Sequence, residues 1–207
     1  MPPAPTGSNL LVKISYASLN PADLVLMRFL PTLLPFRRQP IPGLDFCGRV
    51  VQAGPDAPAE FAVDTEVCGA LSVAVVAVGN GSLAEYVVVP SSLVAVKPPV
   101  LGAAAASGLG ITGQTATLAL REAGVKEGQT VLVNGASGGL GNMLVQLSKG
   151  HGAHVVGICS GANVAMVERL GADEVSALIF FFVRRLHVLS LVSRRSTTRR
   201  MTPCMPT

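Results

Sequence analysis

The 207-residue sequence contains no tryptophan, two tyrosines and four cysteines. No two cysteines have Cys-x-x-Cys spacing, so the sequence predicts neither a structural zinc site nor a dithiol redox motif. A disulfide framework is not expected, because such frameworks occur in short chains dense in cysteine. We therefore expect reduced thiols in an intracellular, cytoplasmic protein.

Long apolar runs are also lacking. The segment ALIFFFV at 177–183 is too short to span a bilayer and ends at Arg184 and Arg185. The first residues lack the basic segment and long apolar stretch of a secretory signal. We therefore predict no membrane span and no secretory leader.

Acidic residues are absent from Ser176 to Thr207, where there are six arginines. The rest of the chain holds 10 basic and 12 acidic side chains, a net charge of −2, although the whole chain carries +4. Nucleic-acid binding needs a basic face on a folded element, so we predict no nucleic-acid partner. Binding of the arginine tail to RNA or an anionic membrane is disfavoured, because its aromatic residues are confined to FFF.

Three regions can be distinguished from the patterns that are present. Residues 10–98 consist mostly of short β-branched segments between turns, among them LSVAVVAV at 71–78, which indicates a small β-barrel or irregular sheet. A helix is predicted from Pro21, with Asn20 as its N-cap. Residues 99–176 alternate helices and strands, although a third strand beginning near Glu174 is not expected to develop. Residues 177–207 form an unrelated arginine-rich tail that we expect to be disordered.

A glycine-rich segment lies within the second region. VLVNGASGGLGNMLVQLSKGHGAHVVGICS, at 131–160, has the pattern of strand, glycine-rich turn, helix and second strand. Such a turn directs backbone N–H groups and the positive end of the helix dipole at one spot, which favours a phosphate. Aligned on its end it contains Ala-x-Gly-x-x-Gly, with Ala136 replacing the first glycine of the dinucleotide fingerprint. An ordinary turn without a ligand is the alternative, which the surrounding βαβ unit disfavours.

The second strand of this unit ends in Cys159 and Ser160, with no acidic residue nearby. A carboxylate there would accept a hydrogen bond from the ribose 2′-hydroxyl of NAD and repel the 2′-phosphate of NADP. Its absence leaves room for a 2′-phosphate, with the Ser160 hydroxyl and the Asn163 amide as donors. No Arg or Lys stands in the loop. In the alternative interpretation Ser160 only caps the following helix.

Together, several segments resemble a known family. LVKISYASLNPAD, PIPGLDFCGRVVQAG, GSLAEYVVVP, GLGITGQTATLAL, the 131–160 unit and RLGADEV occur in family order over about residues 10–175. The chain resembles the medium-chain dehydrogenases/reductases, on the zinc-independent quinone oxidoreductase branch similar to zeta-crystallin. The resemblance implies an α/β protein. A GroES-like β-barrel catalytic domain, at 1–98, would precede a partial Rossmann domain at 99–176, with the cofactor between them.

The resemblance also implies a reaction and a site. NADPH would donate hydride to a small-molecule quinone or α,β-unsaturated carbonyl. Asn20 would contact the nicotinamide ribose, Thr112 would line the nicotinamide pocket and Ser160 would meet the 2′-phosphate. The pyrophosphate would lie against the turn residues Ala136, Ser137, Gly138, Gly139 and Leu140. In the alternatives, Asn20 is only a helix cap and Thr112 only bonds its own helix.

No metal is expected. The zinc branch carries Gly-His-Glu where this chain has Gly43-Leu44-Asp45, and it has a four-cysteine lobe without counterpart here. His151 and His154 have no neighbouring carboxylate or thiol in the sequence, so surface positions are expected for them. Tyr16 and Tyr86 are ordinary strand aromatics in the simpler interpretation, and no catalytic residue is assigned.

The resemblance fails at both ends of the chain. The family's N-terminal hairpin and later βα units have no counterpart, and the change after GADEV resembles a shifted reading frame, an unspliced intron or a gene-model error. We therefore expect weak or no turnover, and loss of the Rossmann edge through which family members often dimerise. The alternatives are a 2-enoyl thioester reductase of the same fold and a non-catalytic dinucleotide-binding remnant.

Overall fold

A computed structural model describes residues 3–33, 41–77 and 79–177, with the side chains of 29–33 excepted. The chain splits into two compact units, Met1–Thr115 and Ala116–Thr207, and the division falls inside helix α4 (Gly110–Ala123). The boundary predicted at 98/99 lies between strand β5 (Val94–Val96) and helix α3 (Ala103–Ser107). The predicted tail at 177–207 lies outside the described residues, Ala177 excepted.

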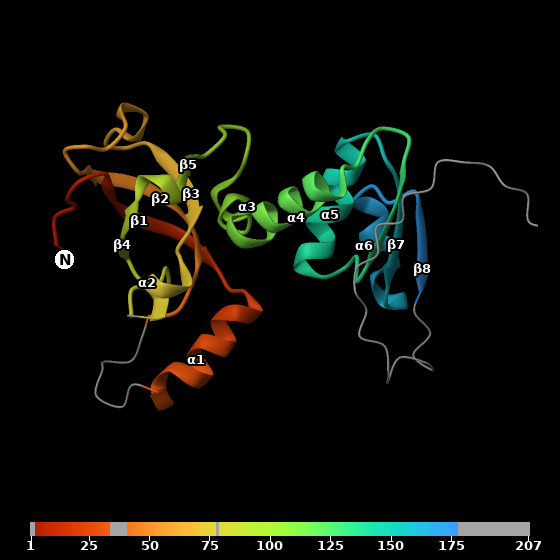
Figure 1. The fold of residues 1–207 in the computed structure, drawn as a ribbon, viewed down its shortest axis with the longest axis horizontal. Helices are drawn as coiled ribbons and strands as arrows, with labels where there is room; N and C mark the ends of the chain where they lie inside the picture. Colours follow the sequence, from red (N-terminus) through yellow and green to blue (C-terminus); the bar gives the residue numbers. More distant parts are fainter. Residues whose placement is uncertain (1–2, 34–40, 78, 178–207) are drawn as a thin grey trace, which may run out of the picture. The chain divides into compact units, whose positions relative to one another are not determined.

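The first unit is built on a five-stranded antiparallel sheet in the order β4-β1-β2-β3-β5 (Figure 1). Its other strands are β1 (Asn9–Ser18), β2 (Asp45–Ala53), β3 (Glu66–Ala70) and β4 (Tyr86–Pro90). Alternate residues of these strands face one apolar core, and each such side chain contributes about 1.5–3 kcal/mol by its burial. The core strand residues, all at most 3% exposed, are Leu10, Val12, Phe46, Val50, Val67, Val87 and Val89.

Helices α1 (Pro21–Leu33) and α2 (Val73–Ala77) and the short helical turns η1 (Ala59–Phe61) and η2 (Ser91–Leu93) complete this unit together with α3. The prediction of a β-segment at 71–78 was wrong, because Val73–Ala77 is helical. Ser72 starts this helix, since its carbonyl oxygen accepts the N–H groups of Val75 and Val76 at 3.0 and 3.2 Å. Val76 enters the core at 1% exposure, so packing outweighs the β-propensity of the valines.

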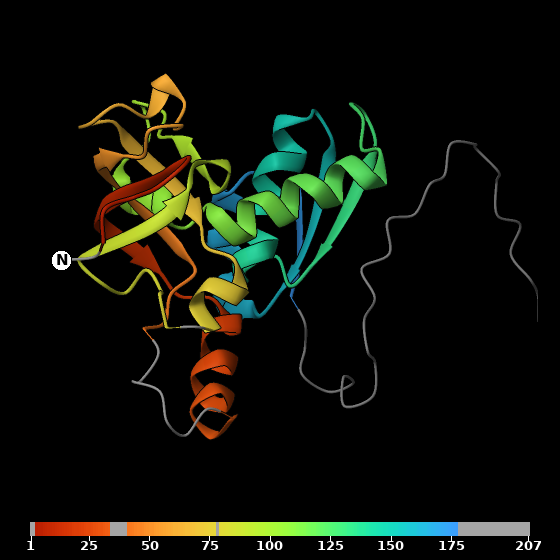
Figure 2. The same ribbon diagram turned by 60° about the vertical axis from the view of Figure 1, so that its left-hand side comes forward.

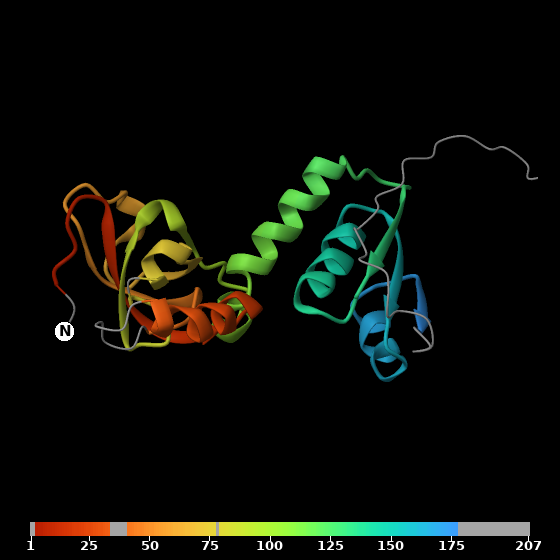
Figure 3. The same ribbon diagram turned by 60° about the horizontal axis from the view of Figure 1, so that its bottom comes forward.

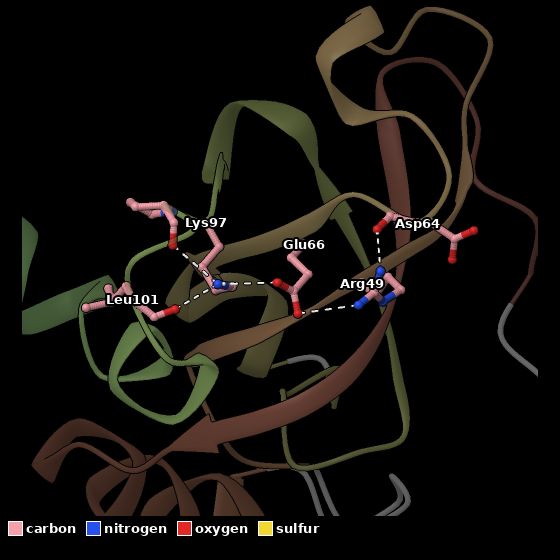
Figure 4. Close-up of polar contacts among 6 residues, drawn as sticks. Arg49, Asp64, Glu66, Lys97 and Leu101 are labelled. Carbon is pink, nitrogen blue, oxygen red and sulfur yellow. Dashed lines mark hydrogen bonds and ion pairs between the residues drawn. The ribbon is translucent and has the colours of Figure 1, made fainter.

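An ion network fastens the segment between β5 and α3 to the sheet (Figure 4). The buried Lys97 ammonium donates to the carbonyl oxygen of Leu101 at 2.7 Å and lies 3.3 Å from Oε2 of Glu66. Oε1 of Glu66 pairs in turn with Arg49 at 3.4 Å. Arg49 also donates to the carbonyl oxygen of Asp64 at 2.8 Å, and Asp64 has a left-handed backbone with φ 73°. The network therefore holds the chain on both sides of β3.

The second unit contains a parallel sheet in the order β6-β7-β8 (Figure 2). Its strands are β6 (Thr130–Asn134), β7 (His154–Cys159) and β8 (Glu174–Ala177), and its helices are α5 (Gly139–Gly150), η3 (Gly161–Asn163) and α6 (Val164–Arg169). The expectation that no third strand develops was wrong, because β8 pairs with β7 from Val156↔Glu174 to Cys159↔Ala177.

One face of this sheet is covered by helices. Helix α5 packs on β6 and β7, and α6 packs on β7 and β8 (Figure 3). The buried valines of this interface are Val131, Val133 and Val155 from the strands, Val145 from α5 and Val167 from α6. On the other face Leu132 is 53% exposed. The strand–helix–strand order, the parallel pairing and the helix cover are those of a partial Rossmann domain, so the predicted α/β fold class is confirmed.

Within the described part of the chain, no helix combines the length and the apolar character needed to cross a membrane.

Candidate functional site

The glycine-rich turn follows β6 and leads directly into α5. Gly135 has a left-handed backbone with φ 72°, a conformation that glycine adopts without the steric cost of a Cβ. The next residue, Ala136, is fully buried, and its N–H donates to the carbonyl oxygen of Ile158 in β7 at 2.9 Å. The N–H of Gly138 closes the turn on the oxygen of Gly135 at 2.9 Å. The turn is thus fixed to both strands.

Helix α5 begins with free donors. Its N-cap is Gly138, which has an extended backbone and no capping side chain. Within α5, the first N–H to reach a carbonyl of the turn is that of Asn142, which donates to the oxygen of Gly138 at 2.8 Å. The preceding N–H groups, at Gly139, Leu140 and Gly141, therefore lack an intrahelical acceptor. Combined with the dipole of a 12-residue helix, they favour an anion at this point.

Close packing between helix and turn depends on a second glycine. A Cβ at Gly141 would overlap the carbonyl oxygen of Gly135 and lie 2.8 Å from Cα of Ala136. Gly157 of β7 is similarly confined, because its Cβ would lie 2.7 Å from Val167. The last glycine of the fingerprint therefore lets the helix approach the turn, while Gly138 lies at its exposed surface.

Three side chains singled out in the sequence lie together beside this turn. Nδ2 of Asn163 donates to Oγ of Ser160 at 2.9 Å and to Oγ of Ser137 at 3.3 Å. Ser137 follows β6 and Ser160 follows the adjacent parallel strand β7, so both lie at the carboxyl end of the sheet. We call Ser137, Ser160 and Asn163 the hydroxyl–amide cluster.

The two serines of the hydroxyl–amide cluster can donate hydrogen bonds to a ligand. Because Asn163 donates to both oxygens, each serine retains its own O–H as a donor. The side chain of Ser160 does not cap η3; the backbone oxygen of Ser160 does, accepting the Asn163 N–H at 2.9 Å. No Asp, Glu, Lys or Arg occurs between Lys149 and Glu168. The cluster thus offers two hydroxyl donors and no carboxylate, which suits a phosphate.

The two histidines considered in the sequence lie at the opposite end of the sheet, His151 as the C-cap of α5 and His154 at the start of β7. His154 begins β7, and its ring is 3.0 Å from Glu174 and 3.7 Å from Asp173. The sequence analysis did not place these carboxylates near His154, because they are distant in the chain. The parallel pairing of β7 with β8 brings them next to the His154 ring. Lys149 also contacts Asp173, and that hydrogen bond lowers the pKa of the carboxyl group. Among the described residues, no group of three or more histidine, cysteine or acidic side chains is arranged to hold a metal ion.

Asn20 occupies the N-cap position of α1, but its side chain does not cap the helix as predicted. Oδ2 of Asp23 accepts the backbone N–H of Asn20 at 2.7 Å, which is one of the two hydrogen bonds of a capping box. Nδ2 of Asn20 donates to Oδ2 of Asp45 at 2.8 Å. Asp45 can only accept when ionised, so it fixes the amide orientation and leaves the Asn20 carbonyl oxygen directed elsewhere.

Asp45 is the central residue of this group, and the sequence analysis missed it. It is fully buried, and its carboxylate accepts from Ser18 at 3.2 Å, Asn20 at 2.8 Å and the N–H of Ile111 at 2.9 Å. Burial raises the pKa of the Asp45 carboxyl group, and the hydrogen bonds from Asn20 and Ile111 offset part of that rise. A Cβ at Gly110 would overlap Oδ1 of Asp45, which explains the glycine that opens α4.

The other residue predicted in the first unit is Thr112, which follows Ile111 in α4. Its hydroxyl donates to the carbonyl oxygen of Gly108 at 2.9 Å, the local helix bond that the alternative interpretation expected. The oxygen of Thr112 still has acceptor capacity, and the residue is half-buried. Asp45 therefore links the two predicted positions, since it binds Asn20 directly and the N–H that precedes Thr112.

The tyrosines show no comparable organisation. Tyr16 is 52% exposed in β1, and Tyr86 pairs with Lys13 at the start of β4.

Comparisons with known proteins agree with this architecture. The family model for the alcohol dehydrogenase GroES-like domain matches residues 6–99. A quinone-oxidoreductase homolog of chloroplasts from Spinacia oleracea is 39% identical over 180 residues, covering 84% of this chain and 53% of the relative. A trans-enoyl reductase from Aspergillus terreus is 34% identical over 189 residues, with coverage of 84% and 51%.

A solved structure extends the likeness to three dimensions. The quinone oxidoreductase of Thermus thermophilus, which has also been determined in complex with NADPH, matches with a TM-score of 0.66 and 27% identity. The match covers 86% of this chain and 54% of the Thermus chain. This chain thus spans about half the length of the curated relatives it matches. It belongs to the medium-chain dehydrogenase/reductase superfamily, on the zinc-independent quinone oxidoreductase branch.

Proposed function

We propose that this chain binds NADPH and forms part of an oxidoreductase that reduces a quinone or an α,β-unsaturated carbonyl. When bound, NADPH would supply the hydride. The observation that carries the proposal is the hydroxyl–amide cluster beside the N-terminus of α5. There a helix start with free N–H groups adjoins two serine hydroxyls, and no carboxylate stands between them.

Two phosphate groups would meet different parts of this arrangement. The pyrophosphate would lie against the turn from Ala136 to Leu140 and accept the N–H groups that lack an intrahelical acceptor at the start of α5, where the helix dipole favours negative charge. The 2′-phosphate would accept from Ser160, whose hydroxyl orientation is set by the amide of Asn163. Ser137 belongs to the turn itself, and its hydroxyl oxygen accepts a hydrogen bond from the same Asn163 amide. The cluster therefore favours NADPH over NADH.

Asn20 and Thr112 would act at the nicotinamide end of the cofactor. The carbonyl oxygen of Asn20, directed away from Asp45, would accept a hydrogen bond from a ribose hydroxyl. Thr112 would line the nicotinamide pocket. No residue of the described chain is assigned as a proton donor for the reduced acceptor.

Replacement of the serine tests the cofactor preference. Ser160→Ala removes a charge-assisted donor, and we expect about a ten-fold loss of NADPH affinity, equal to about 1.4 kcal/mol. Binding of NADH should stay within a factor of two, since it lacks the 2′-phosphate. Ser176→Ala, an exposed serine in β8, is the matched control. Equal losses for NADPH and NADH would contradict the role proposed for Ser160.

The electron acceptor has a specific alternative. A trans-enoyl reductase is among the relatives, which favours a 2-enoyl thioester as the second candidate acceptor. Steady-state oxidation of NADPH with a quinone, an enone and an enoyl thioester separates these substrates. Saturable NADPH binding without turnover of any acceptor would instead favour a non-catalytic dinucleotide-binding chain.

The cytoplasm is the compartment that we propose. The spinach relative is named a chloroplast protein, so imaging of a fluorescent fusion distinguishes a cytoplasmic from an organellar distribution. Accumulation in an organelle would contradict the proposal.

A further inference from the structure

Two cysteines that are distant in the sequence lie opposite each other in the antiparallel sheet of the first unit. Cys47 of β2 and Cys68 of β3 are direct partners in an unbroken register from Asp45↔Ala70 to Arg49↔Glu66. Both are free thiols. Neither residue belongs to the proposed cofactor site.

The hydrogen-bond pattern identifies the kind of pair they form. At one end of the ladder the N–H of Leu71 donates to the oxygen of Leu44 at 2.8 Å, and at the other that of Val50 donates to Thr65 at 3.0 Å. Hydrogen-bonded and non-hydrogen-bonded pairs alternate along an antiparallel ladder. Counting from either end makes the pair Cys47↔Cys68 non-hydrogen-bonded.

This geometry suits a disulfide. The Cα atoms of a non-hydrogen-bonded pair lie about 4.5 Å apart, and their side chains leave the sheet on the same face. A disulfide spans Cα separations of about 4.4–6.8 Å. The register therefore brings the two sulfur atoms within bonding reach without any shift of the strands.

The two thiols differ in access. Cys47 is 1% exposed, and α3 packs against the strands that carry it. Cys68 is only partly buried. Burial raises the pKa of Cys47 to about 11 and also raises that of Cys68, which the positive charge of Lys97 partly offsets. Cys68 is thus the thiol that reacts first with an oxidant, and Cys47 is the neighbouring thiol that reacts second.

We propose that Cys47 and Cys68 form a thiol–disulfide pair that is oxidised by low-molecular-weight disulfides of the glutathione class. The thiolate of Cys68 attacks oxidised glutathione, forms a mixed disulfide and releases one glutathione thiolate. The sulfur of Cys47 then attacks the sulfur of Cys68 and releases the second. The chain loses two electrons and two protons, and oxidised glutathione becomes two molecules of reduced glutathione.

The Cys47–Cys68 disulfide would involve β2, the strand that also carries Asp45. Cys47 lies two residues after Asp45 on the same face of β2, because side chains alternate along a strand. Closing the loop from 47 to 68 restricts the unfolded chain, so oxidation should raise the melting temperature of the first unit.

The test uses the full chain, reduced and then incubated with oxidised glutathione at mildly alkaline pH, where the thiolate fraction is larger. In the expected product, Cys47 and Cys68 together have lost two hydrogen atoms, and neither residue carries glutathione. Proteolysis without reductant should yield one peptide pair linked through Cys47 and Cys68. A stable mixed disulfide on Cys47 or Cys68 in the wild type, or a link from either residue to Cys159 or Cys204, would overturn the proposal.

Single variants separate the two steps. Cys47→Ser should stop at a mixed disulfide on Cys68, because the second thiol is missing. Cys68→Ser should leave Cys47 unmodified, because it is buried. Cys159→Ser, in the second unit, is the control and should form the bond as the wild type does. If Cys47→Ser and the wild type give the same product, Cys47 does not act on Cys68.

Discussion

Two glycines of the fingerprint turn have different physical roles, and alanine substitutions separate them. Gly141 lets α5 approach the turn, since a Cβ there would overlap the carbonyl oxygen of Gly135. Backbone atoms cannot yield as a flexible side chain does, so Gly141→Ala must displace the helix. Such overpacking costs about 1–3 kcal/mol, and the higher helix propensity of alanine returns at most about 1 kcal/mol. We expect a net loss of about 1–2 kcal/mol.

Gly138→Ala should leave stability almost unchanged. Gly138 has φ −76° and ψ 168°, which alanine adopts freely, and the nearest atom to the added Cβ, the carbonyl oxygen of Gly135 at 3.3 Å, needs to shift only slightly. The new methyl group would instead stand at the exposed start of α5, where we propose that the pyrophosphate binds. We expect a change in stability within about 0.5 kcal/mol and at least a ten-fold loss of NADPH affinity, or about 1.4 kcal/mol.

Gly150→Ala is the matched control in the same helix. A Cβ at Gly150 meets nothing within 4 Å, so the substitution should stabilise the helix by about 0.5–1 kcal/mol without affecting NADPH. Urea unfolding followed by far-UV circular dichroism measures stability, because the chain has no tryptophan. A Gly141→Ala variant as stable as Gly150→Ala would refute the packing argument. Unchanged NADPH binding by Gly138→Ala would refute the phosphate site.

Two further predictions concern charged groups of the first unit. Lys97→Met leaves the carbonyl of Leu101 without its donor, and we expect the free energy of unfolding to fall by about 1.5–3 kcal/mol. Glu66→Gln should cost less than about 1 kcal/mol, because the Glu66 side chain is 44% exposed. A larger loss for Glu66→Gln than for Lys97→Met in urea unfolding would contradict the network. Burial raises the pKa of Asp45 when the chain folds, so the folded state binds the proton more tightly, and stability should fall as pH rises from 3.8 through the raised pKa. Asp45→Asn should flatten that part of the pH profile, and parallel profiles of wild type and variant would refute this assignment.

The second unit could largely be predicted from the sequence, because its determinants are local. The strand–turn–helix pattern from Val131 to Ser160 fixed the position of the turn, and the rule that parallel strands end at one edge of the sheet accounts for the contact between Ser137 and Asn163. The third strand was missed because β8 is only four residues long, and its pairing with β7 is not visible in its composition.

The first unit was less predictable, because its important contacts depend on strand register. The sequence analysis considered Asp45 only as a departure from a zinc motif, and no local pattern shows that Ser18, Asn20 and Ile111 converge on it. The pairing of Cys47 with Cys68 has the same origin. Their separation fits no redox motif, and only the β2–β3 register makes them neighbours.

The central claim is that this chain carries an NADPH site, and titration of the purified chain with NADPH and NADH tests it most directly. Nicotinamide fluorescence reports binding without interference from tryptophan, which the chain lacks. The account predicts saturable binding of both cofactors, with NADPH at least ten-fold tighter, or about 1.4 kcal/mol. A folded chain that binds neither cofactor, or that prefers NADH, would contradict it.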